Sequence, residues 1–362
     1  MKPRIIISGG GTGGHIFPAL AIADELKAQF PTASLLFVGA YNRMEMQRVP
    51  KAGYPIKGLW ISGFDRKNMI RNILFPIKLG WSLLQALFIV LKFRPNVVVG
   101  TGGFASGPLV FVASLLRIPS ILQEQNAYPG VTNKQLASRV NTICLGSDAA
   151  MRFFPTGKTV VTGNPVRKAL HESLSRTTAA TVIGVDPQDF TLLVLGGSLG
   201  ARKINQLVKN HLPDIKKHNV QLIWQCGNLY AEEYQSLTSE SIHVVPFIDN
   251  MSAAYAASDL VVSRAGALAI SELCLTAKPT LFVPSPNVSE NHQEKNAQAL
   301  VDKKAAFMVV EHHAEAEFWP ELMSLIESEL LRNTLSKNIK NFAYPNATKE
   351  IVSTITQHLP TS

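Results

Sequence analysis

Short apolar runs alternate with longer helix-like stretches along the whole chain. Each run is apolar at nearly every position, which is typical of strands buried on both faces of a parallel sheet. The runs form two sets: Arg4–Ile7, Leu35–Val38, Val97–Val99, Ser120–Leu122 and Asn141–Cys144, then Thr191–Leu195, Gln221–Trp224, Ile242–Val245, Leu260–Val262 and Thr280–Val283. The stretches between them suit the helices of βαβ crossovers. The pattern therefore predicts an α/β fold with two doubly wound parallel-sheet units in series.

The length of 362 residues agrees with two domains. We expect the boundary just after Pro165, with domains over 1–166 and 167–344. Residues 171–190 are polar and interrupted by glycine and proline, as a linker or a domain entry would be. A capped helix is predicted over 345–360, where it would pack back on the first domain.

Charge is divided unevenly between the two predicted domains. Residues 1–166 carry 18 Lys and Arg against 6 Asp and Glu, whereas the remainder carries 17 against 20. A strongly basic half favours a polyanionic partner. The chain has no aromatic-rich basic motif of the RNA-binding kinds, so we expect no nucleic-acid partner and favour an anionic membrane surface.

The three cysteines, Cys144, Cys226 and Cys274, lie far apart and form no Cys-x-x-Cys pair. This spacing disfavours a disulfide framework or a zinc site and favours a reducing compartment. The apolar run after the N-terminus is too short for the core of a signal peptide. We therefore expect the protein on the cytoplasmic side of the membrane.

Three predicted strands turn into helices through glycine-rich loops, at residues 9–14, 100–103 and 196–200. Glycine lets the backbone approach a ligand, and a helix N-terminus adds partial positive charge, so such loops suit a diphosphate. One loop alone is equally well a tight βα turn. Three loops at the carboxyl ends of parallel strands favour a ligand, because open α/β sheets bind ligands at that edge.

The first loop also matches the G-x-G-x-x-G pattern of dinucleotide-binding folds. That fold needs an acidic residue at the end of the second strand to hold the ribose. Here the strand ends at Ala40 and is followed by Tyr41 and Asn42, so the acid is missing. The sequence therefore disfavours a nicotinamide or flavin oxidoreductase.

Residues 73–91 are almost entirely apolar and contain only Lys78 as a charge. A stretch of this length can span a bilayer. We favour a surface helix instead, because the predicted strand at 97–99 follows at once and needs a crossover. Together with the basic residues beside it, segment 66–92 is predicted to bind an anionic membrane surface peripherally. The alternative is a solvated charge rim over a buried helix.

A series of longer motifs covers residues 5 to about 350. They are Gly10-Gly11-Thr12-Gly13-Gly14-His15-Ile16-Phe17-Pro18-Ala19, Gly102-Gly103-Phe104-Ala105-Ser106-Gly107-Pro108, Glu124-Gln125-Asn126, Gly163-Asn164-Pro165-Val166-Arg167, Gly196-Gly197-Ser198-Leu199-Gly200-Ala201, Phe247-Ile248-Asp249-Asn250-Met251, Ser263-Arg264-Ala265-Gly266-Ala267-Leu268, Ser271-Glu272 and His292-Gln293-Glu294-Lys295-Asn296-Ala297. Collectively they resemble the MurG family, the N-acetylglucosaminyltransferases that convert lipid I to lipid II in peptidoglycan synthesis. The chain departs from the family pattern at Gln123, where the family often has His, and at Ala269, where it often has Thr.

The resemblance implies a GT-B architecture, with two Rossmann-like doubly wound domains facing across a cleft. The C-terminal domain would hold UDP-N-acetylglucosamine and the N-terminal domain the lipid I acceptor. The reaction would be inverting transfer to the 4-hydroxyl of the muramoyl sugar, at the cytoplasmic face of the bacterial inner membrane. Cell-wall synthesis proteins are candidate partners. No cofactor is expected, and the chain contains no Asp-x-Asp to hold a catalytic metal on the diphosphate.

His15 is the first candidate for the base that deprotonates the acceptor hydroxyl, because histidine titrates near neutrality and this one opens the first helix. Glu124 is the alternative, since burial can raise the pKa of a carboxyl far enough for the same task. Each also has a purely structural interpretation: His15 would order the loop, and Glu124 would orient Asn126.

The remaining predicted site residues are substrate-binding. The departing diphosphate would be met by backbone N–H groups at Thr12, Gly13 and Gly14 and by the Ser198 loop, while the Glu272 carboxylate would take both ribose hydroxyls. Ile248 would offer backbone groups to uracil. Gln293 and Asn296 would hold sugar hydroxyls. Contacts implied by the family resemblance alone are Asn126, Arg167, Ala267, Leu268, Ala269, Ile270 and Ser271.

Three rival functions stay open at this point. The nearest is a related GT-B transferase that makes a glycolipid, and the next is a UDP-sugar epimerase of the same fold. A non-catalytic module that binds a sugar nucleotide or a membrane belongs to a different class.

Overall fold

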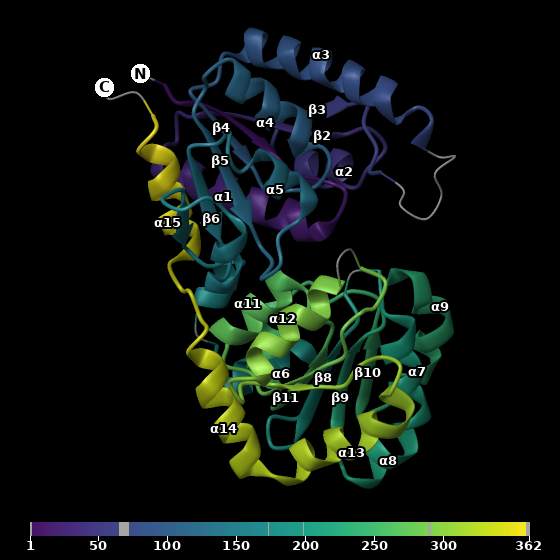
Figure 1. Ribbon diagram of the computed structural model, residues 1–362. Coiled ribbons are helices and arrows are strands. Elements are labelled where there is room, and N and C mark those ends of the chain that lie inside the picture. Colours follow the sequence, from purple (N-terminus) through teal and green to yellow (C-terminus); the bar gives the residue numbers. More distant parts are fainter. Residues whose placement is uncertain (1, 65–71, 173, 198, 289–290, 360–362) are drawn as a thin grey trace. The chain divides into compact units, whose positions relative to one another are not determined.

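The computed structural model describes residues 2–64, 72–172, 174–197, 199–288 and 291–359 (Figure 1). Two compact units make up the chain: Met1–Val166 with Asn346–Ser362, and Arg167–Pro345. Each has its own parallel sheet and its own hydrophobic core.

The first unit contains a seven-stranded parallel sheet in the order β3-β2-β1-β4-β5-β6-β7. At its centre, Ile6 pairs with Leu36 on one side and with Val98 on the other. Both faces of these central strands are buried, as the apolar runs predicted. The strands are β1 (Arg4–Ser8), β2 (Ser34–Ala40), β3 (Ile56–Leu59), β4 (Val97–Gly100), β5 (Ser120–Glu124), β6 (Thr142–Leu145) and β7 (Thr159–Val161).

Helices cover both faces of this sheet. Ile5 and Ile7 point into a core shared with α1 and α15, whereas Ile6 points into a core shared with α3 and α4. The last helix of the chain, α15, therefore lies beside α1 on the first unit (Figure 1). The helices are α1 (Gly13–Gln29), α2 (Glu45–Lys51), α3 (Phe75–Phe93), α4 (Ser106–Leu115), α5 (Val131–Leu136), the short 3₁₀ helix η2 (Asp148–Phe153) and α15 (Ala347–Thr356).

Helix α3 forms the predicted crossover between β3 and β4, and it packs along α4 (Figure 1). Only Ser82, Ala86 and Val90 are buried, one per helical turn, so far more of its apolar surface is exposed than a helix packed on the sheet would show. Pro76 lies in the first turn, where its missing N–H costs nothing, and the helix continues through it. By length and composition alone, α3 could cross a membrane.

The second unit contains a six-stranded parallel sheet in the order β10-β9-β8-β11-β12-β13. Its core packs apolar residues of the central strands against α7 and α13. The strands are β8 (Thr191–Leu195), β9 (Gln221–Gln225), β10 (Ile242–Val245), β11 (Leu260–Ser263), β12 (Thr280–Phe282) and β13 (Phe307–Met308). The helices are the 3₁₀ helix η3 (Lys168–His171), α6 (Arg176–Ile183), α7 (Arg202–Asn210), α8 (Leu212–Lys217), the 3₁₀ helices η4 (Asn228–Tyr230) and η5 (Gln235–Leu237), α9 (Ala231–Tyr234), α10 (Met251–Ala257), α11 (Ala267–Leu275), α12 (His292–Val301), α13 (Ala314–Glu327) and α14 (Glu329–Lys340).

The sequence predicts a linker or a domain entry over residues 171–190. The linker is wrong, because the segment lies inside the second unit and contains α6, which packs against α10. Ser175 caps the helix by accepting a hydrogen bond from the Thr178 N–H. Gly184 ends it in the left-handed conformation, with a φ of 88°. The glycine that suggested a broken segment is thus a C-terminal cap. The predicted C-terminal helix forms as α15, but the side chain of Asn346 makes no capping bond.

Candidate functional site

Three loops of the first unit meet at the carboxyl edge of its sheet, because β1, β4 and β5 are neighbours. The loop after β1 and the loop after β4 approach each other closely. A Cβ on Gly103 would lie 2.2 Å from the carbonyl oxygen of Gly10 and 3.1 Å from Nδ1 of His15. Gly103 has a φ of 80°, so both its conformation and this contact require glycine.

His15 is in the first turn of α1, and its ring lies against the glycine loop that precedes the helix. Its Nδ1 lies 3.2 Å from the carbonyl oxygen of Gly10 and 3.2 Å from Oγ1 of Thr12. A carbonyl oxygen can only accept, so the first contact requires that Nδ1 carries the hydrogen. In the neutral ring, Nε2 then carries the lone pair. In this tautomer, Nε2 is the ring nitrogen that can accept a proton.

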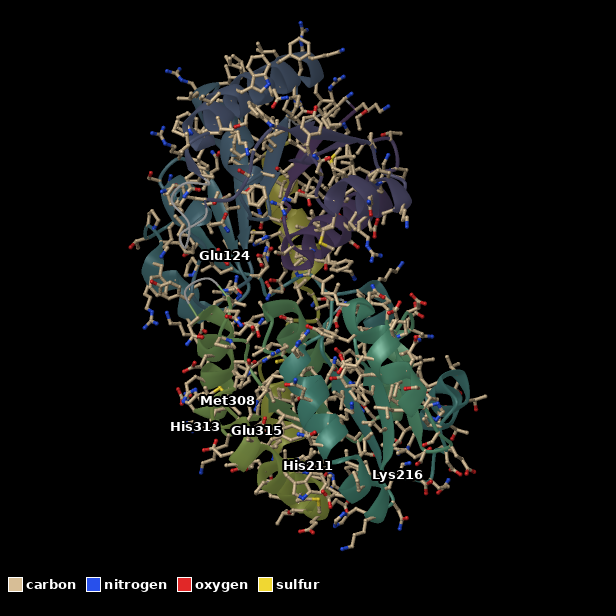
Figure 2. All side chains as sticks on the ribbon, turned by 90° about the vertical axis from the view of Figure 1, so that its right-hand side faces the viewer. Glu124, His211, Lys216, Met308, His313 and Glu315 are labelled. Atoms are coloured by element: carbon tan, nitrogen blue, oxygen red, sulfur yellow. The ribbon has the colours of Figure 1, made fainter. Side chains whose placement is uncertain are left out.

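The carboxylate of Glu124 is buried at the end of β5 and is labelled in Figure 2. Its Oε1 accepts from the backbone N–H of Asn126 at 3.0 Å and from the Asn126 side chain at 3.1 Å. Its Oε2 accepts from the side chain of Asn133 at 2.8 Å and from the N–H of Gly130 at 3.1 Å. Four donors occupy the acceptor positions of this carboxylate. Glu124 thus shapes the 124–130 turn and fixes Asn126.

The N-terminus of α1 supplies the other predicted groups of the first unit. Thr12 is the N-cap, and Gly13 and Gly14 are the first helical residues. Backbone N–H groups in the first turn of a helix have no intrahelical partner and favour an anion. The N-terminus of this 17-residue helix therefore has the unpaired N–H groups that suit a phosphate, in the same turn as His15.

In the second unit, the Glu272 carboxylate lies on α11 with only 7% of its surface exposed. Nε of Arg167 lies 2.9 Å from its Oε1, and the hydroxyl of Tyr255 donates to its Oε2 at 3.1 Å. Burial raises the pKa of the Glu272 carboxyl, and Arg167 and Tyr255 partly oppose that shift. Each oxygen keeps one further acceptor position, so the carboxylate can take two hydroxyl donors, as in a ribose diol.

Helix α11 begins at Ala267, with Gly266 as its N-cap, and carries Glu272 in its second turn. The N–H of Ile270 donates to the Gly266 carbonyl at 2.9 Å, so the N–H groups of Ala267, Leu268 and Ala269 precede the first intrahelical bond. These are the groups that can meet a phosphate. The Ser271 hydroxyl donates to the Ala267 carbonyl at 3.0 Å and is thereby turned toward its own helix.

The other residues predicted to contact the UDP-sugar already have hydrogen-bond partners within the second unit. The N–H of Ile248 donates to Gln225 at 2.9 Å, and the side-chain oxygen of Gln293 accepts from the N–H of Ser285 at 2.9 Å. The Asn296 side chain is buried beside the carbonyl of Ala265, at 3.4 Å. These bonds fix the orientations of the side-chain amides. Ser198 lies outside the described residues.

The sequence did not identify Tyr255, Asn133 or Glu45 as site residues. Tyr255 and Asn133 hold the two carboxylates described above. Glu45 is fully buried and accepts from the N–H of Gly11 at 3.1 Å. Among the described residues, no group of three or more His, Cys, Asp or Glu side chains is placed to hold a metal ion.

The geometry defines the class of the protein. Two parallel α/β units each place glycine turns and helix N-termini at the carboxyl ends of their strands, an arrangement that binds nucleotides and sugar phosphates. The chain matches the model of the glycosyltransferase family 28 N-terminal domain over residues 5–145 and that of the family 28 C-terminal domain over residues 191–351. It therefore belongs to glycosyltransferase family 28 and has the predicted GT-B fold.

Two relatives extend this likeness over nearly the whole chain. A protein of Flavobacterium psychrophilum and one of Christiangramia forsetii are each 50% identical to it, over 97% of this chain and 96% of their own. Both are named UDP-N-acetylglucosamine–N-acetylmuramyl-(pentapeptide) pyrophosphoryl-undecaprenol N-acetylglucosamine transferase.

Solved structures agree with this assignment. MurG of Acinetobacter baumannii is 29% identical and superposes with a TM-score of 0.78, over 98% of this chain and 99% of that one. A UDP-N-acetylglucosamine 2-epimerase superposes with a TM-score of 0.66 at 12% identity, over 99% of this chain and 97% of that one. The second likeness shows a shared fold alone.

Proposed function

We propose that the protein transfers N-acetylglucosamine from UDP-N-acetylglucosamine to the 4-hydroxyl of the muramoyl sugar of lipid I, giving lipid II and UDP with inversion at the anomeric carbon. The near full-length likeness to relatives named for this transfer carries the proposal. The buried Glu272 carboxylate, with two acceptor positions beside a helix N-terminus, suits the ribose and phosphate of the donor.

The base in this proposal is His15, acting through Nε2. The acceptor hydroxyl loses its proton to Nε2 as its oxygen attacks the anomeric carbon, and the bond from that carbon to UDP breaks. The proton then passes from the imidazolium to water. Glu124 is less suited to this task, because four hydrogen-bond donors already occupy its carboxylate. We assign it the task of holding Asn126 toward the acceptor.

Donor recognition belongs to the second unit. Glu272 takes the ribose hydroxyls, and the N–H groups of Ala267, Leu268 and Ala269 meet the diphosphate as negative charge grows on UDP. Gln293 and Asn296 hold hydroxyls of the transferred sugar. Arg167 is assigned a different role from the predicted substrate contact, because its guanidinium is paired with Glu272.

The first test is release of UDP from UDP-N-acetylglucosamine, with and without a lipid I analogue, in EDTA. We expect release that requires the analogue and survives EDTA, and that falls by at least about 10³-fold in His15→Ala, within the range for loss of a catalytic base. Turnover of a diacylglycerol acceptor instead of the lipid I analogue would favour a glycolipid transferase. Release without any acceptor would favour the epimerase. Binding without release would leave only a binding module.

We also propose that the protein is peripheral to the cytoplasmic face of the inner membrane and that the outer face of α3 docks there. Side chains spaced along this helix are exposed, among them Ile77, Trp81, Leu84, Phe88 and Leu91. An apolar helical face inserts into the acyl boundary of a membrane, and each basic residue near an anionic surface adds about 1 kcal/mol.

This docking can be tested with two substitutions on that face. Leu84→Asp and Phe88→Asp should reduce cosedimentation with anionic lipid vesicles while leaving thermal stability unchanged, because the two side chains are 60% and 67% exposed. Leu330→Asp is the matched control, since that leucine is 79% exposed and lies on α14 of the second unit. Equal vesicle binding by all three variants would exclude α3 as the docking face.

A further inference from the structure

A buried carboxylate of the first unit has no part in the mechanism proposed above. Glu45 is the first residue of α2 and is fully buried. Its Oε1 accepts from the N–H of Ala40 at 3.0 Å, and its Oε2 accepts from the N–H of Gly11 at 3.1 Å. Burying a carboxylate is costly even when it is hydrogen-bonded, so a buried acid at a site loop calls for a reason.

The backbone leaves space for this side chain. A Cβ on Gly10 would lie 2.2 Å from Oε1 of Glu45, and a Cβ on Gly39 would lie 2.4 Å from its Cγ. Neither glycine has a positive φ, so the demand for glycine at these two positions comes from the packed carboxylate rather than from the backbone conformation. The glycine loop is therefore built around Glu45.

The carboxylate is connected to His15 through a single peptide group. The Gly11 N–H, which donates to Glu45, and the Gly10 carbonyl, which lies 3.2 Å from Nδ1 of His15, belong to the same peptide bond. The order is carboxylate, peptide N–H, peptide carbonyl, imidazole Nδ1–H. Hydrogen bonds arranged in such a chain polarise one another.

We propose that Glu45 is a positioning residue that makes His15 a stronger base by polarising the Gly10–Gly11 peptide. In a catalytic triad, a carboxylate orients the histidine by bonding to it directly, and here the peptide group stands between the two. The proposal rests on the proposed function, in which His15 is the base. Glu45 takes no proton itself. It strengthens the Gly10 carbonyl as an acceptor, which holds the hydrogen on Nδ1 and favours the imidazolium that forms when Nε2 is protonated.

Two other charged groups approach this assembly from neighbouring elements. Arg43 precedes α2, and its guanidinium carbon lies 5.6 Å from the ring centroid of Phe104. Glu124 of β5 bonds to Asn133, whose side chain is next to Gly102, and Gly102 is next to the His15 ring. Within the described part of the chain, Glu45 is the charged group that the Gly10–Gly11 peptide joins to the ring, so its removal should have an effect of its own on the titration of His15.

The experiment compares Glu45→Gln with the wild type in the full-length chain. Glutamine keeps the shape and loses the charge. We expect kcat to fall about tenfold and the acid limb of the kcat–pH profile to move about one pH unit lower, because His15 would be a weaker base that protonates less readily. The KM values for UDP-N-acetylglucosamine and the lipid I analogue should change less than about twofold.

Two further variants provide a graded series and a control. Glu45→Asp keeps the charge but withdraws it from Gly11, so its acid limb should lie between those of the wild type and Glu45→Gln. Asp24 lies on the same helix as His15, and its carboxylate accepts from the hydroxyl of Tyr54. Asp24→Asn removes this charge, and its kcat–pH profile should match that of the wild type. If Glu45→Gln does not fold, Glu45→Asp decides the question.

A second readout does not depend on turnover. The His15 imidazole signal, identified with His15→Gln, can be titrated by NMR in the wild type and in each Glu45 variant. A lower midpoint supports the proposal, and an unchanged midpoint in a folded variant overturns it. A raised KM with an unchanged kcat–pH profile would likewise show that Glu45 only orders the loop. Absence of lipid-I-dependent UDP release by the wild type would refute the proposed function and leave the NMR comparison intact.

Discussion

Two buried carboxylates of this protein differ in how many acceptor positions they keep. Glu124 receives four hydrogen bonds, three from its own turn and one from Asn133 of α5, and has no position to spare for a substrate. Glu272 receives one donor on each oxygen and retains one position on each. Counting donors therefore separates a carboxylate that holds a loop from one that can bind a ligand, which their similar burial does not.

The raised pKa of Glu272 makes donor binding sensitive to pH. Burial stabilises the protonated carboxyl, whose ordinary pKa is 4.5. The affinity for UDP should therefore fall on acidification at a pH above the ordinary carboxyl range. The free energy of unfolding should change with pH in the opposite direction, because burial of the charged carboxylate costs stability. The Glu272 carboxyl therefore stabilises the fold at low pH and ceases to do so as pH rises through its raised pKa. Calorimetric titration of UDP binding against pH measures the first effect.

Tyr255→Phe provides a sharper test of the Glu272 carboxylate. Its hydroxyl donates to Glu272, so its removal should raise the carboxyl pKa further and move the acid loss of UDP affinity to higher pH. At neutral pH, affinity should fall several-fold, because more of the Glu272 carboxyl is then protonated and cannot accept from both ribose hydroxyls. Glu272→Gln should bind UDP weakly at every pH, without an acid transition. A Tyr255→Phe curve that coincides with the wild type would exclude this role.

Glu124→Gln should act on the acceptor and on stability rather than on the base. The new amide NH₂ group would face N–H donors of the turn, leaving some of them unpaired at about 1–3 kcal/mol each. The prediction is a lower melting temperature and a higher KM for the lipid I analogue, with the acid limb of the kcat–pH profile unmoved. A lost or displaced limb with normal stability would instead make Glu124 the base.

At the scale of single residues, the sequence predicted site residues that lie within motifs and missed the partners that hold them from elsewhere in the chain. His15, Glu124 and Glu272 belong to recognisable motifs. Tyr255 and Glu45 lie in helices, 17 and 34 residues from the groups they bond. Nothing local indicates such a partner, because each pairing forms only when the folded chain brings the two residues together.

At the scale of elements, the strands missed by the sequence are all at sheet edges. All ten apolar runs form strands, but β3, β7 and β13 were not predicted, and each is the last strand on its side of a sheet. An edge strand packs against one neighbour and need not be apolar on both faces. Lys57 in β3 and the half-exposed β7 show the consequence.

Helix α15 should be a structural part of the first unit. Ile351, Val352 and Ile355 are fully buried in the core that it shares with α1. Ile351→Ala should destabilise the protein by about 2–5 kcal/mol, the usual cost of such a truncation in a packed core. Chemical denaturation measures this cost. Ser353→Ala, at an exposed position of the same helix, should change stability by less than about 0.5 kcal/mol. Equal stability of the two variants would contradict this role.

At the scale of the whole molecule, the division of charge follows the same boundary as the proposed division of function. The net positive charge comes from residues 1–166, the part that carries α3, whereas the remainder is slightly acidic. A donor nucleotide needs only local positive charge, from helix ends and a few side chains. A surplus of Lys and Arg over Asp and Glu, spread over one unit, suits an extended anionic surface such as a lipid leaflet.

The two parts of the proposed membrane contact should respond differently to salt. Raising ionic strength from about 0.05 M to about 0.5 M shortens the screening length severalfold, so binding of the wild type to anionic vesicles should weaken sharply. The residual binding should come from the apolar face of α3, which salt does not screen, and Phe88→Asp should abolish it. Vesicles of zwitterionic lipid isolate that residual part at low salt. Binding that is strong and independent of salt would mean that the basic surplus has no part in docking, and complete loss at high salt would mean that α3 has none.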